Sequence, residues 1–314
     1  MGFSTRDMEL LIRLKKDGYF TGGLSVVEIG AQQLSNTILK APELVEDAGR
    51  IFGVGQPFEL AKPVESYLIH GHTEHLSTSA PFARDLWKWL GFDYASIDID
   101  GSPGSIALDL NYDDVPRKAK GKYQLVTNYG TTDHVANQLN AFKVIHELAA
   151  LGGVMIHNIP AQGMINHGLV NYNPKFFWML ARSNGYKWLY MGLDMAGVGY
   201  PIPQNIMDML AASNPDIPAP LRDSRIADGG LVVAMQKVFD TPYVAPIDVQ
   251  TGTSTDNPSL KRRYWTVFHP DAFAKPWLAA PMDCGGLKAR LARLKDLRSK
   301  LARRIAVAFR LSQA

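Results

Sequence analysis

Polar side chains that could bind a ligand follow four short apolar runs of the sequence. The residues concerned are Glu28 with Gly30, Asp98, Asp109 with Leu110 and Asn111, and Asn128, Tyr129 and Gly130 followed by Asp133 and His134. A carboxylate after one strand can accept hydrogen bonds from both vicinal hydroxyls of a ribose, and one after the next strand from an exocyclic amine such as that of adenine. Aspartate and asparagine also end strands as turn formers. Their recurrence at four strand ends therefore predicts a ligand site.

The apolar runs belong to a regular alternation of strands and helices. Strands are expected at 24–29, 94–99, 105–110, 123–127, 154–157, 188–191 and 231–238, and helices at 4–17, 81–90, 136–150 and 174–184. This alternation predicts a mostly parallel sheet that helices cover on both faces. Ligands of such sheets bind outside the carboxyl ends of the strands.

The order of these motifs resembles that of the class I S-adenosylmethionine-dependent methyltransferases. V-V-E-I-G-A-Q at 26–32 is similar to their first motif, and Y-A-S-I-D-I-D at 94–100 to their second strand with its ribose-binding acid. A-L-D-L-N at 107–111 resembles the adenine loop, and Y-Q-L-V-T-N-Y-G-T-T-D-H-V at 123–135 the strand and loop that face the methyl group. L-A-A-L-G-G-V-M-I-H at 148–157 matches the family's helix, Gly-Gly and strand. The stretch H-G-L-V-N-Y-N-P-K-F-F at 167–177 resembles a segment of bacterial members of this family that are associated with sugar and polysaccharide pathways.

The resemblance covers roughly residues 20–240 and implies a fold, a cofactor and a reaction. The fold is a doubly wound α/β, Rossmann-like, mostly parallel sheet of seven strands, and the reaction is methyl transfer from S-adenosylmethionine to a small polar acceptor, such as a sugar-derived one. Cofactor contacts are expected from Glu28, Gly30, Ala31, Gln32, Asp98, Asp109, Leu110, Asn128, Tyr129 and Gly130. The family usually has further glycines where this chain has Ala31, Gln32 and Gln33. A methyltransferase-like binding subunit without activity is therefore kept as an alternative.

The resemblance also directs attention to three histidines. Methyl transfer to an alcohol or phenol needs a base for the acceptor's proton, and histidine suits that task near neutral pH. His134, after the fourth strand, is the best-placed candidate, and His157 and His167 lie on the neighbouring edge. A packed or hydrogen-bonded structural role competes with catalysis for each, and it is favoured for His157 and His167. N-methylation, which needs no such base, stays an alternative.

The stretch H-G-H-T-E-H at 70–75 suggests a different chemistry. His70, His72 and His75 imitate the H-x-H-x-D-H spacing of metallo-β-lactamase-like hydrolases, which hold zinc. Glu74 stands where aspartate is usual, and the later order of elements follows a methyltransferase. A polar loop is therefore the preferred interpretation, and no metal site is predicted.

The composition is ordinary for a soluble globular protein, with 46% hydrophobic and 20% charged residues. Cys284 is the only cysteine, which excludes an internal disulfide and a cysteine-based zinc cage. No apolar run approaches the ~20 residues of a membrane-spanning helix. Arg6, Asp7 and Glu9 argue against a signal peptide, so a reduced, cytoplasmic setting is expected.

The chain is expected to divide into a methyltransferase-like domain at 1–245 and an extension at 246–314. The long segment 33–82, rich in proline and glycine, is predicted to be an irregular insertion after the first strand. From Leu287 a leucine stripe opposite many lysines and arginines predicts a basic amphipathic helix. Such a helix can dock on its own protein, on a partner or on an anionic membrane surface. The sequence is also compatible with a homo-oligomer. Nucleic acid is the least favoured partner.

Overall fold

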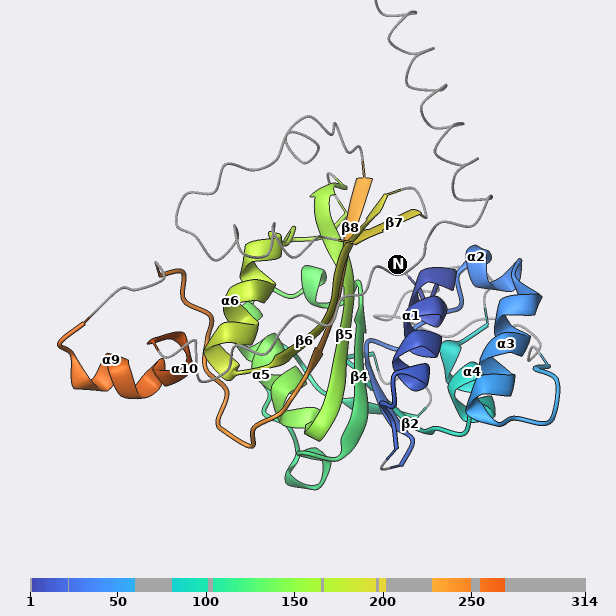
Figure 1. Ribbon diagram of the computed structural model, residues 1–314, viewed down its shortest axis with the longest axis horizontal. Helices are drawn as coiled ribbons and strands as arrows, with labels where there is room; N and C mark the ends of the chain where they lie inside the picture. Colours follow the sequence, from blue (N-terminus) through green and yellow to red (C-terminus); the bar gives the residue numbers. More distant parts are fainter. Residues whose placement is uncertain are drawn as a thin grey trace, which may run out of the picture.

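The computed structural model describes residues 2–21, 23–59, 81–100, 104–164, 167–195, 198–201, 228–249 and 255–268. Over this part of the chain it shows one sheet with the strand order β3-β2-β1-β4-β5-β8-β6-β7 (Figure 1). The strands are β1 (Ser25–Ile29), β2 (Asp93–Asp98), β3 (Ser105–Ala107), β4 (Tyr123–Tyr129), β5 (Ala149–Gly163), β6 (Lys187–Met195), β7 (Val198–Pro201) and β8 (Asp228–Gln236). All seven predicted strands are present, and the short β7 is an additional edge strand.

The sheet confirms the predicted doubly wound, mostly parallel fold. Strands β1 to β5 pair in parallel, whereas β8 lies antiparallel between β5 and β6. Strand β1 has β2 on one side and β4 on the other, so the strand order reverses direction there. Ligands of doubly wound sheets bind at such a switch point, outside the carboxyl ends of the strands.

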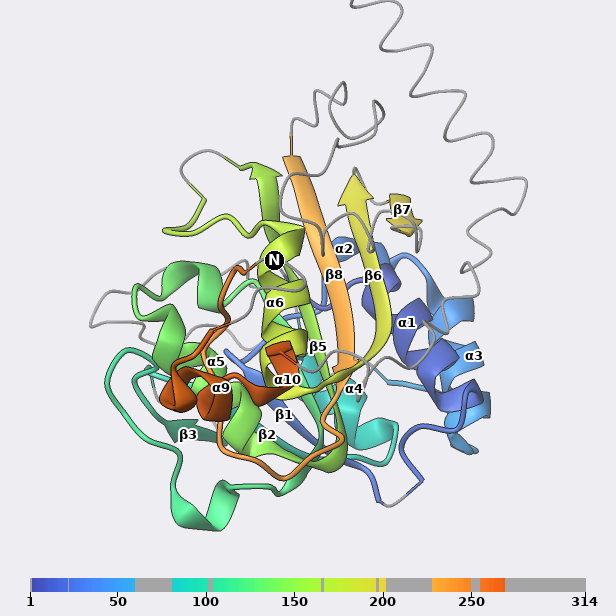
Figure 2. The same cartoon turned by 60° about the vertical axis from the view of Figure 1, so that its left-hand side comes forward.

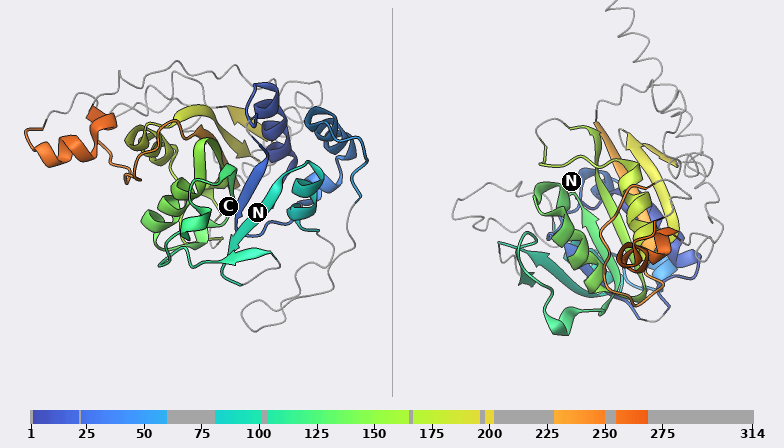
Figure 3. Two further views of the ribbon diagram at one scale, coloured as in Figure 1. Left: turned by 90° about the horizontal axis from the view of Figure 1, so that it is seen from below. Right: turned by 90° about the vertical axis from the view of Figure 1, so that its left-hand side faces the viewer.

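Helices cover both faces of the sheet and enclose two apolar clusters (Figures 1 and 2). Helices α5 (Gln138–Leu148) and α6 (Pro174–Asn184) pack on one face, where Phe142 and Phe177 are fully enclosed. Helices α1 (Thr5–Lys16), α3 (Pro42–Phe52) and α4 (Ala83–Trp89) pack on the other, around Met8 and Trp87. The views in Figure 3 show the same three layers.

Local capping signals explain where the best-predicted helices begin and end. At the start of α1, Ser4 and Asp7 form a reciprocal capping box, which satisfies two backbone N–H groups that the helix leaves free. At the start of α6, the Asn173 side chain accepts from the N–H of Lys175. Gly185 closes α6 with a φ of 64°, a left-handed conformation that glycine adopts without strain. The predicted bounds of α6 are confirmed.

The segment predicted to be an irregular insertion is largely helical from residue 36 to residue 52. It contains the short α2 (Asn36–Leu39) and the longer α3, which begins at Pro42 and ends at Phe52, with Gly53 as its C-cap. Proline is tolerated in the first helical turn because its missing N–H would be unpaired there anyway. Pro42 thus starts a helix, and the prediction of irregular structure was wrong for this part. His70, His72 and His75 lie outside the described residues.

Among the described residues, the extension contains two short helices, α9 (Pro258–Arg263) and α10 (Trp265–Phe268). Helix α10 docks on the end of α6, where Thr266 donates to the carbonyl of Ser183 and Arg182 donates to that of Val267. The predicted basic helix from Leu287 onward lies outside the described residues. Within the described part of the chain, no helix combines the length and apolar character needed to cross a bilayer.

Candidate functional site

The register of the parallel strands brings the predicted site residues to one edge of the sheet. Ile29 at the end of β1 lies beside Ile97 of β2 and Asn128 of β4. Asn128 in turn lies beside His157 of β5. The loops that leave these strands therefore share the edge at which the strand order reverses.

The loop after β1 is anchored on the end of β2. Gly30 adopts a φ of 80° and donates its N–H to the carbonyl of Ile97 at 2.7 Å. The next N–H, of Ala31, donates to Oδ2 of Asp98 at 2.9 Å, and Ile99 donates to Oδ1 of the same carboxylate at 2.8 Å. Asp98 is half-buried, and its pKa is raised mainly by that burial. Each carboxylate oxygen has two lone pairs, so Asp98 keeps acceptor capacity for a ligand.

Two side chains close over the glycine turn. The amide of Gln32 donates to the carbonyl of Gly30 and to Oγ1 of Thr131, both at 3.2 Å. Thr131 donates to the carbonyl of Ile29 at 2.6 Å. A side chain at Gly30 would collide with the Thr131 hydroxyl. Gln32 is thus buried and occupied with its own loop, and sequence reasoning did not identify Thr131 as its partner.

Glu28 points into the core between the sheet and α4. Its carboxylate accepts from Trp87 Nε1 at 2.7 Å, from the Tyr94 hydroxyl at 2.8 Å and from the Gln32 N–H at 3.0 Å. Burial raises the pKa of Glu28 to about 7. These partners give Glu28 a structural role at the end of β1, and the side chain has no surface left for a cofactor.

The segment after β3 is organised as a turn. Oδ1 of Asp109 accepts from the backbone N–H of Asn111 at 2.8 Å and from its side-chain amide at 3.2 Å. Asp109 stays half-exposed, whereas Leu110 is buried. A side-chain oxygen that bonds the backbone two residues on is typical of an aspartate turn. The structure thus shows Asp109 as a turn former, the ordinary alternative for an acid at the end of a strand.

The residues at the end of β4 divide between core and surface. Asn128 is buried and donates to Thr132 Oγ1 at 2.8 Å, and Tyr129 is buried against Phe3 on the α1 side of the sheet. Gly130 is half-exposed and has a φ of 76°. Of this predicted set, only Gly130 has a surface that a ligand could reach.

His157 is enclosed by aromatic rings from the helices that cover β5. Its ring centroid lies 5.6 Å from that of Phe142 and 5.0 Å from that of Phe177. Burial lowers the pKa of His157 to about 3, so the ring is neutral at ordinary pH. The side chain is 1% exposed and cannot meet an acceptor in this conformation. The structural role favoured for His157 agrees with this environment.

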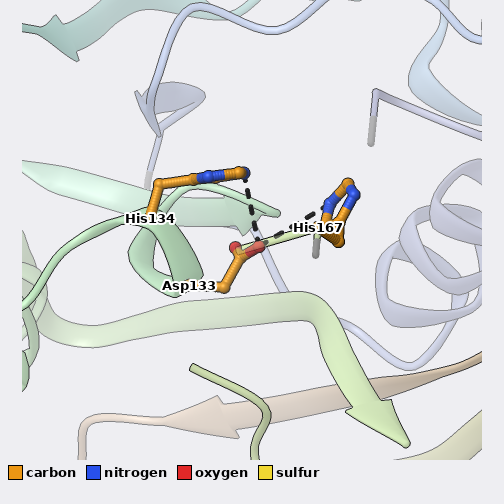
Figure 4. Close-up of side chains that lie close together, drawn as sticks. All are labelled: Asp133, His134 and His167. Atoms are coloured by element: carbon orange, nitrogen blue, oxygen red, sulfur yellow. Dashed lines mark ion pairs between the residues drawn. The ribbon is translucent and has the colours of Figure 1, made fainter. Parts of the chain in front are cut away.

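His134 and His167 instead meet at the surface, on either side of a buried aspartate (Figure 4). His134 lies in η2 (Thr132–His134), the short helix that follows β4, and His167 follows β5. Oδ2 of Asp133 lies 3.4 Å from Nε2 of His134 and 3.7 Å from Nε2 of His167. The two imidazoles are 51% and 35% exposed, whereas the Asp133 side chain is fully buried.

The structure therefore sorts the predicted residues into two groups. Ala31, Asp98, Asp109, Gly130, His134 and His167 reach the surface at this edge, whereas Glu28, Gly30, Gln32, Leu110, Asn128, Tyr129 and His157 are buried. Sequence reasoning named Asp133 with His134 after the fourth strand but assigned Asp133 no role in the site. The Asp-His pair directly after a strand was the signal that could have given it one.

Known protein families and curated proteins showed no match to the chain. Solved structures with a similar arrangement include a 1,6-didemethyltoxoflavin N1-methyltransferase from Burkholderia thailandensis, with 10% identity over 75% of this chain and 78% of that one, at a TM-score of 0.38. An S-adenosylmethionine-dependent methyltransferase from Archaeoglobus fulgidus has 12% identity over 73% and 94%, at 0.36. The O-methyltransferase of a polyketide synthase from Brevibacillus brevis has 10% identity over 74% and 72%, at 0.38.

Proposed function

We propose that the protein transfers a methyl group from S-adenosylmethionine to a hydroxyl of a small polar acceptor. The observation that carries this proposal is the switch-point edge, where the Asp98 carboxylate ends β2 beside the glycine turn and the exposed His134 follows β4. A carboxylate that can accept hydrogen bonds from ribose hydroxyls and an imidazole that can take a proton lie on the same edge of a doubly wound sheet, which supports the proposal. Sugar-derived alcohols are the first class of acceptor to test.

Asp98 is the residue best suited to hold the cofactor's ribose. Its carboxylate is fixed by the N–H groups of Ala31 and Ile99, so it needs no reorientation when a ligand arrives. The remaining lone pairs can accept from both ribose hydroxyls. The surfaces of Ala31 and Gly130, on the loops beside it, complete the proposed cofactor site.

His134 is the proposed base for the acceptor. In-line transfer moves the methyl carbon from sulfur to oxygen, and the hydroxyl proton must leave as the new bond forms. Nε2 of His134 faces Oδ2 of Asp133 at 3.4 Å, so we assign the acceptor's proton to Nδ1 on the other side of the ring. The Asp133 carboxylate then offsets the positive charge that the imidazole gains.

A second candidate function is a methyltransferase-like subunit that does not transfer a methyl group. The observation that favours it is the closure of the glycine turn by Gln32 and Thr131, which fills the space above Gly30 with protein atoms. N-methylation is a further alternative, because that chemistry does not require His134.

Calorimetric titration of the full chain with S-adenosylmethionine and with S-adenosylhomocysteine tests the proposal. Saturable binding with one site per chain is expected for both. Titration without heat at concentrations up to the millimolar range would contradict the proposal. Where binding is found, the chain is incubated with cofactor labelled on the methyl group and with sugar alcohols, phenols and amines. Label on a hydroxyl supports O-methylation, and label on an amine supports N-methylation. If no acceptor is labelled, the result supports the subunit without activity.

A further inference from the structure

The Asp133 side chain is a buried carboxyl group that has no hydrogen-bond partner among the described residues. Among the residues that the structure describes, neither of its oxygens accepts a hydrogen bond, and its side chain is fully enclosed. Burying an ionised carboxylate is costly unless a positive charge or hydrogen-bond donors compensate it. The Nε2 atoms of His134 and His167 lie 3.4 and 3.7 Å from Oδ2, and a cation bound between them and the carboxylate would supply a compensating positive charge.

The three side chains also have the spacing of metal ligands. One potential ligand atom from each residue lies within 4.8 Å of the other two. Zinc bound to nitrogen and oxygen at about 2.0–2.1 Å in a tetrahedral site separates its ligand atoms by roughly 3.3–3.4 Å. The distances of 3.4 Å and 3.7 Å from Asp133 Oδ2 to the two Nε2 atoms are close to that separation. A cation can therefore be bound with small side-chain rotations.

Backbone contacts hold His167 against Asp133. The N–H groups of Leu169 and Val170 both donate to the carbonyl of Asp133, at 2.7 and 3.1 Å. A side chain at Gly168 would come within 2.9 Å of the Asp133 carbonyl oxygen and carboxylate, so glycine permits this close approach. The loop after β5 is thus attached to the loop after β4 at the point where the three ligands meet.

A second network fixes the other side of the cluster. Thr132 Oγ1 accepts from Asn128 at 2.8 Å and from the Tyr172 hydroxyl at 2.8 Å. The Gln138 amide donates to the carbonyl of Thr132 at 2.7 Å. These bonds hold η2 in place, and pre-organised ligands of this kind increase the affinity of a metal site.

We infer that Asp133, His134 and His167 bind a divalent transition-metal cation. Two imidazole nitrogens and one carboxylate oxygen favour zinc, iron or manganese over magnesium and calcium, which prefer all-oxygen ligands. Three protein ligands leave at least one coordination position open, as in catalytic metal sites. The exposed outer faces of both imidazoles place that position toward the solvent at the carboxyl edge of the sheet.

The catalytic consequence of this site rests on the proposed O-methyl transfer. An acceptor hydroxyl bound at the open position would lose its proton to solvent more readily, because the cation stabilises the alkoxide. The oxygen then forms its bond to the methyl carbon as the carbon–sulfur bond of the cofactor breaks and its electron pair returns to sulfur. With the cation bound, His134 acts as a ligand, and the cation replaces it as the group that activates the hydroxyl.

Metal binding can be measured without cofactor or acceptor. The full chain is stripped with a chelator, dialysed and titrated with Zn²⁺ and Mn²⁺ by calorimetry, and with Co²⁺ by visible absorption. One site per chain is expected, with Mg²⁺ binding far more weakly. Asp133→Asn and His167→Ala should each weaken Zn²⁺ binding by about 100-fold or more and change the Co²⁺ spectrum. Circular dichroism and thermal melting identify variants that have not folded.

The matched control replaces His70, His72 and His75 together by alanine, because that stretch is the other histidine-rich candidate. This variant should keep the site, whereas loss of stoichiometric binding in it alone would move the metal to residues 70–75 and overturn the inference. Absence of stoichiometric Zn²⁺ or Mn²⁺ binding by the unmodified chain would also overturn it. In a Gly168→Ala variant the added methyl group would lie too close to the Asp133 carboxylate, so this variant should bind Zn²⁺ more weakly than the unmodified chain. The triple histidine variant should bind Zn²⁺ as tightly as the unmodified chain.

The outcomes separate the metal site from the proposed function. A chain that binds Zn²⁺ through Asp133 but does not bind S-adenosylmethionine supports the metal site and contradicts the methyltransferase. A chain that transfers methyl groups equally well before and after chelation, and binds no metal, supports the methyltransferase and contradicts the metal site.

Discussion

Asp98 Oδ2 accepts a hydrogen bond from the N–H of Ala31 at 2.9 Å, which links the loops after β1 and β2. Additional glycines are usual in this loop of the methyltransferases that the sequence resembles. In this chain a carboxylate from the neighbouring strand fixes the backbone instead, while Gln32 closes the turn from inside. The loop is therefore already ordered by protein groups, and the same carboxylate that orders it is the proposed ribose ligand.

This double role leads to a prediction for Asp98→Ala. The variant should bind S-adenosylmethionine more weakly by about 1–3 kcal/mol, because it loses hydrogen bonds to a charged group. Calorimetry measures the loss directly. Asp93→Ala is the matched control: Asp93 lies at the other end of β2, is exposed and pairs only loosely with Lys122 at 3.5 Å. Equal affinity of the Asp98 variant and the unmodified chain would exclude Asp98 from the cofactor site.

A second prediction concerns the buried Glu28. Its pKa is about 7 in the folded protein, above the ordinary value of 4.5, because burial penalises the charged form. The folded state therefore holds this proton where the unfolded state has lost it. The stability that it contributes is fully present below about pH 4.5 and is lost as the pH rises to about 7. Glu28→Gln should remove this dependence.

Urea unfolding of both proteins at a series of pH values provides the measurement. The difference in unfolding free energy between the two should change most between pH 4.5 and 7 and be flat above that range. Asp7 is a useful control because burial raises its pKa to about 6, so Asp7→Asn should change the profile at lower pH. A constant difference between Glu28→Gln and the unmodified protein would show that Glu28 is charged in the core.

A third prediction concerns His157, whose effect on stability has the opposite sign. Burial lowers its pKa from 6.5 to about 3, so the unfolded state binds a proton that the folded state excludes. Stability from this group is present above about pH 6.5 and is lost as the pH falls toward 3. His157→Leu keeps an apolar side chain between Phe142 and Phe177 and should unfold less readily than the unmodified protein at pH 4 to 5. Thermal melting of both proteins at pH 4.5 and at pH 7.5 checks this. If the melting temperature of His157→Leu falls further below that of the unmodified protein at pH 4.5 than at pH 7.5, the prediction is contradicted.

Local signals explain how much of the fold could be predicted from the sequence. Helix α6 was predicted with its bounds because Asn173, Pro174 and Gly185 specify its ends within a few residues. Strand β5 extends well beyond 154–157, to Gly163, because it pairs with β8 over that length. Helix α3 was missed because the prolines and glycines of the segment indicated irregular structure. The packing of its apolar face against α1, which stabilises the helix, is not visible in the local sequence. The length of β5 and the presence of α3 thus both depend on pairing and packing between segments that are distant in the sequence.

The candidate site shows the same limit. The position of Asp98 at the end of β2 follows from the hydrophobic pattern of the strand, and the structure places it at the expected edge. The burial of Glu28 depends on Trp87, 59 residues further along the chain, which no local pattern indicates. The meeting of His167 with the Asp133 carboxylate depends on the backbone bonds that Leu169 and Val170, after β5, donate to the Asp133 carbonyl. Strand ends are thus visible in the sequence, whereas the partners of each carboxylate are not.

The last prediction concerns His134 and separates its two proposed roles. His134→Ala should lower turnover by roughly 10²–10⁴ and leave the affinity for S-adenosylmethionine nearly unchanged. The reason is that its imidazole lies at the exposed end of η2 and serves either as the base or as a metal ligand. Turnover is measured with labelled cofactor and any acceptor found by the screen described above, and cofactor affinity by calorimetry. Near-normal turnover would remove His134 from the mechanism.

His167→Ala is the comparison that distinguishes base from ligand. If His134 acts as a free base, His167→Ala should retain most of the activity and the rise of turnover with pH that deprotonation of an imidazole produces, whereas His134→Ala should lose that rise. If both histidines bind a cation, the two variants should lose activity to a similar extent, and chelation should reduce the unmodified enzyme to the same level. Loss of cofactor binding in His134→Ala would instead assign it a structural role. The comparison relies on the shared position of both imidazoles, 3.4 and 3.7 Å from the same carboxylate oxygen of Asp133.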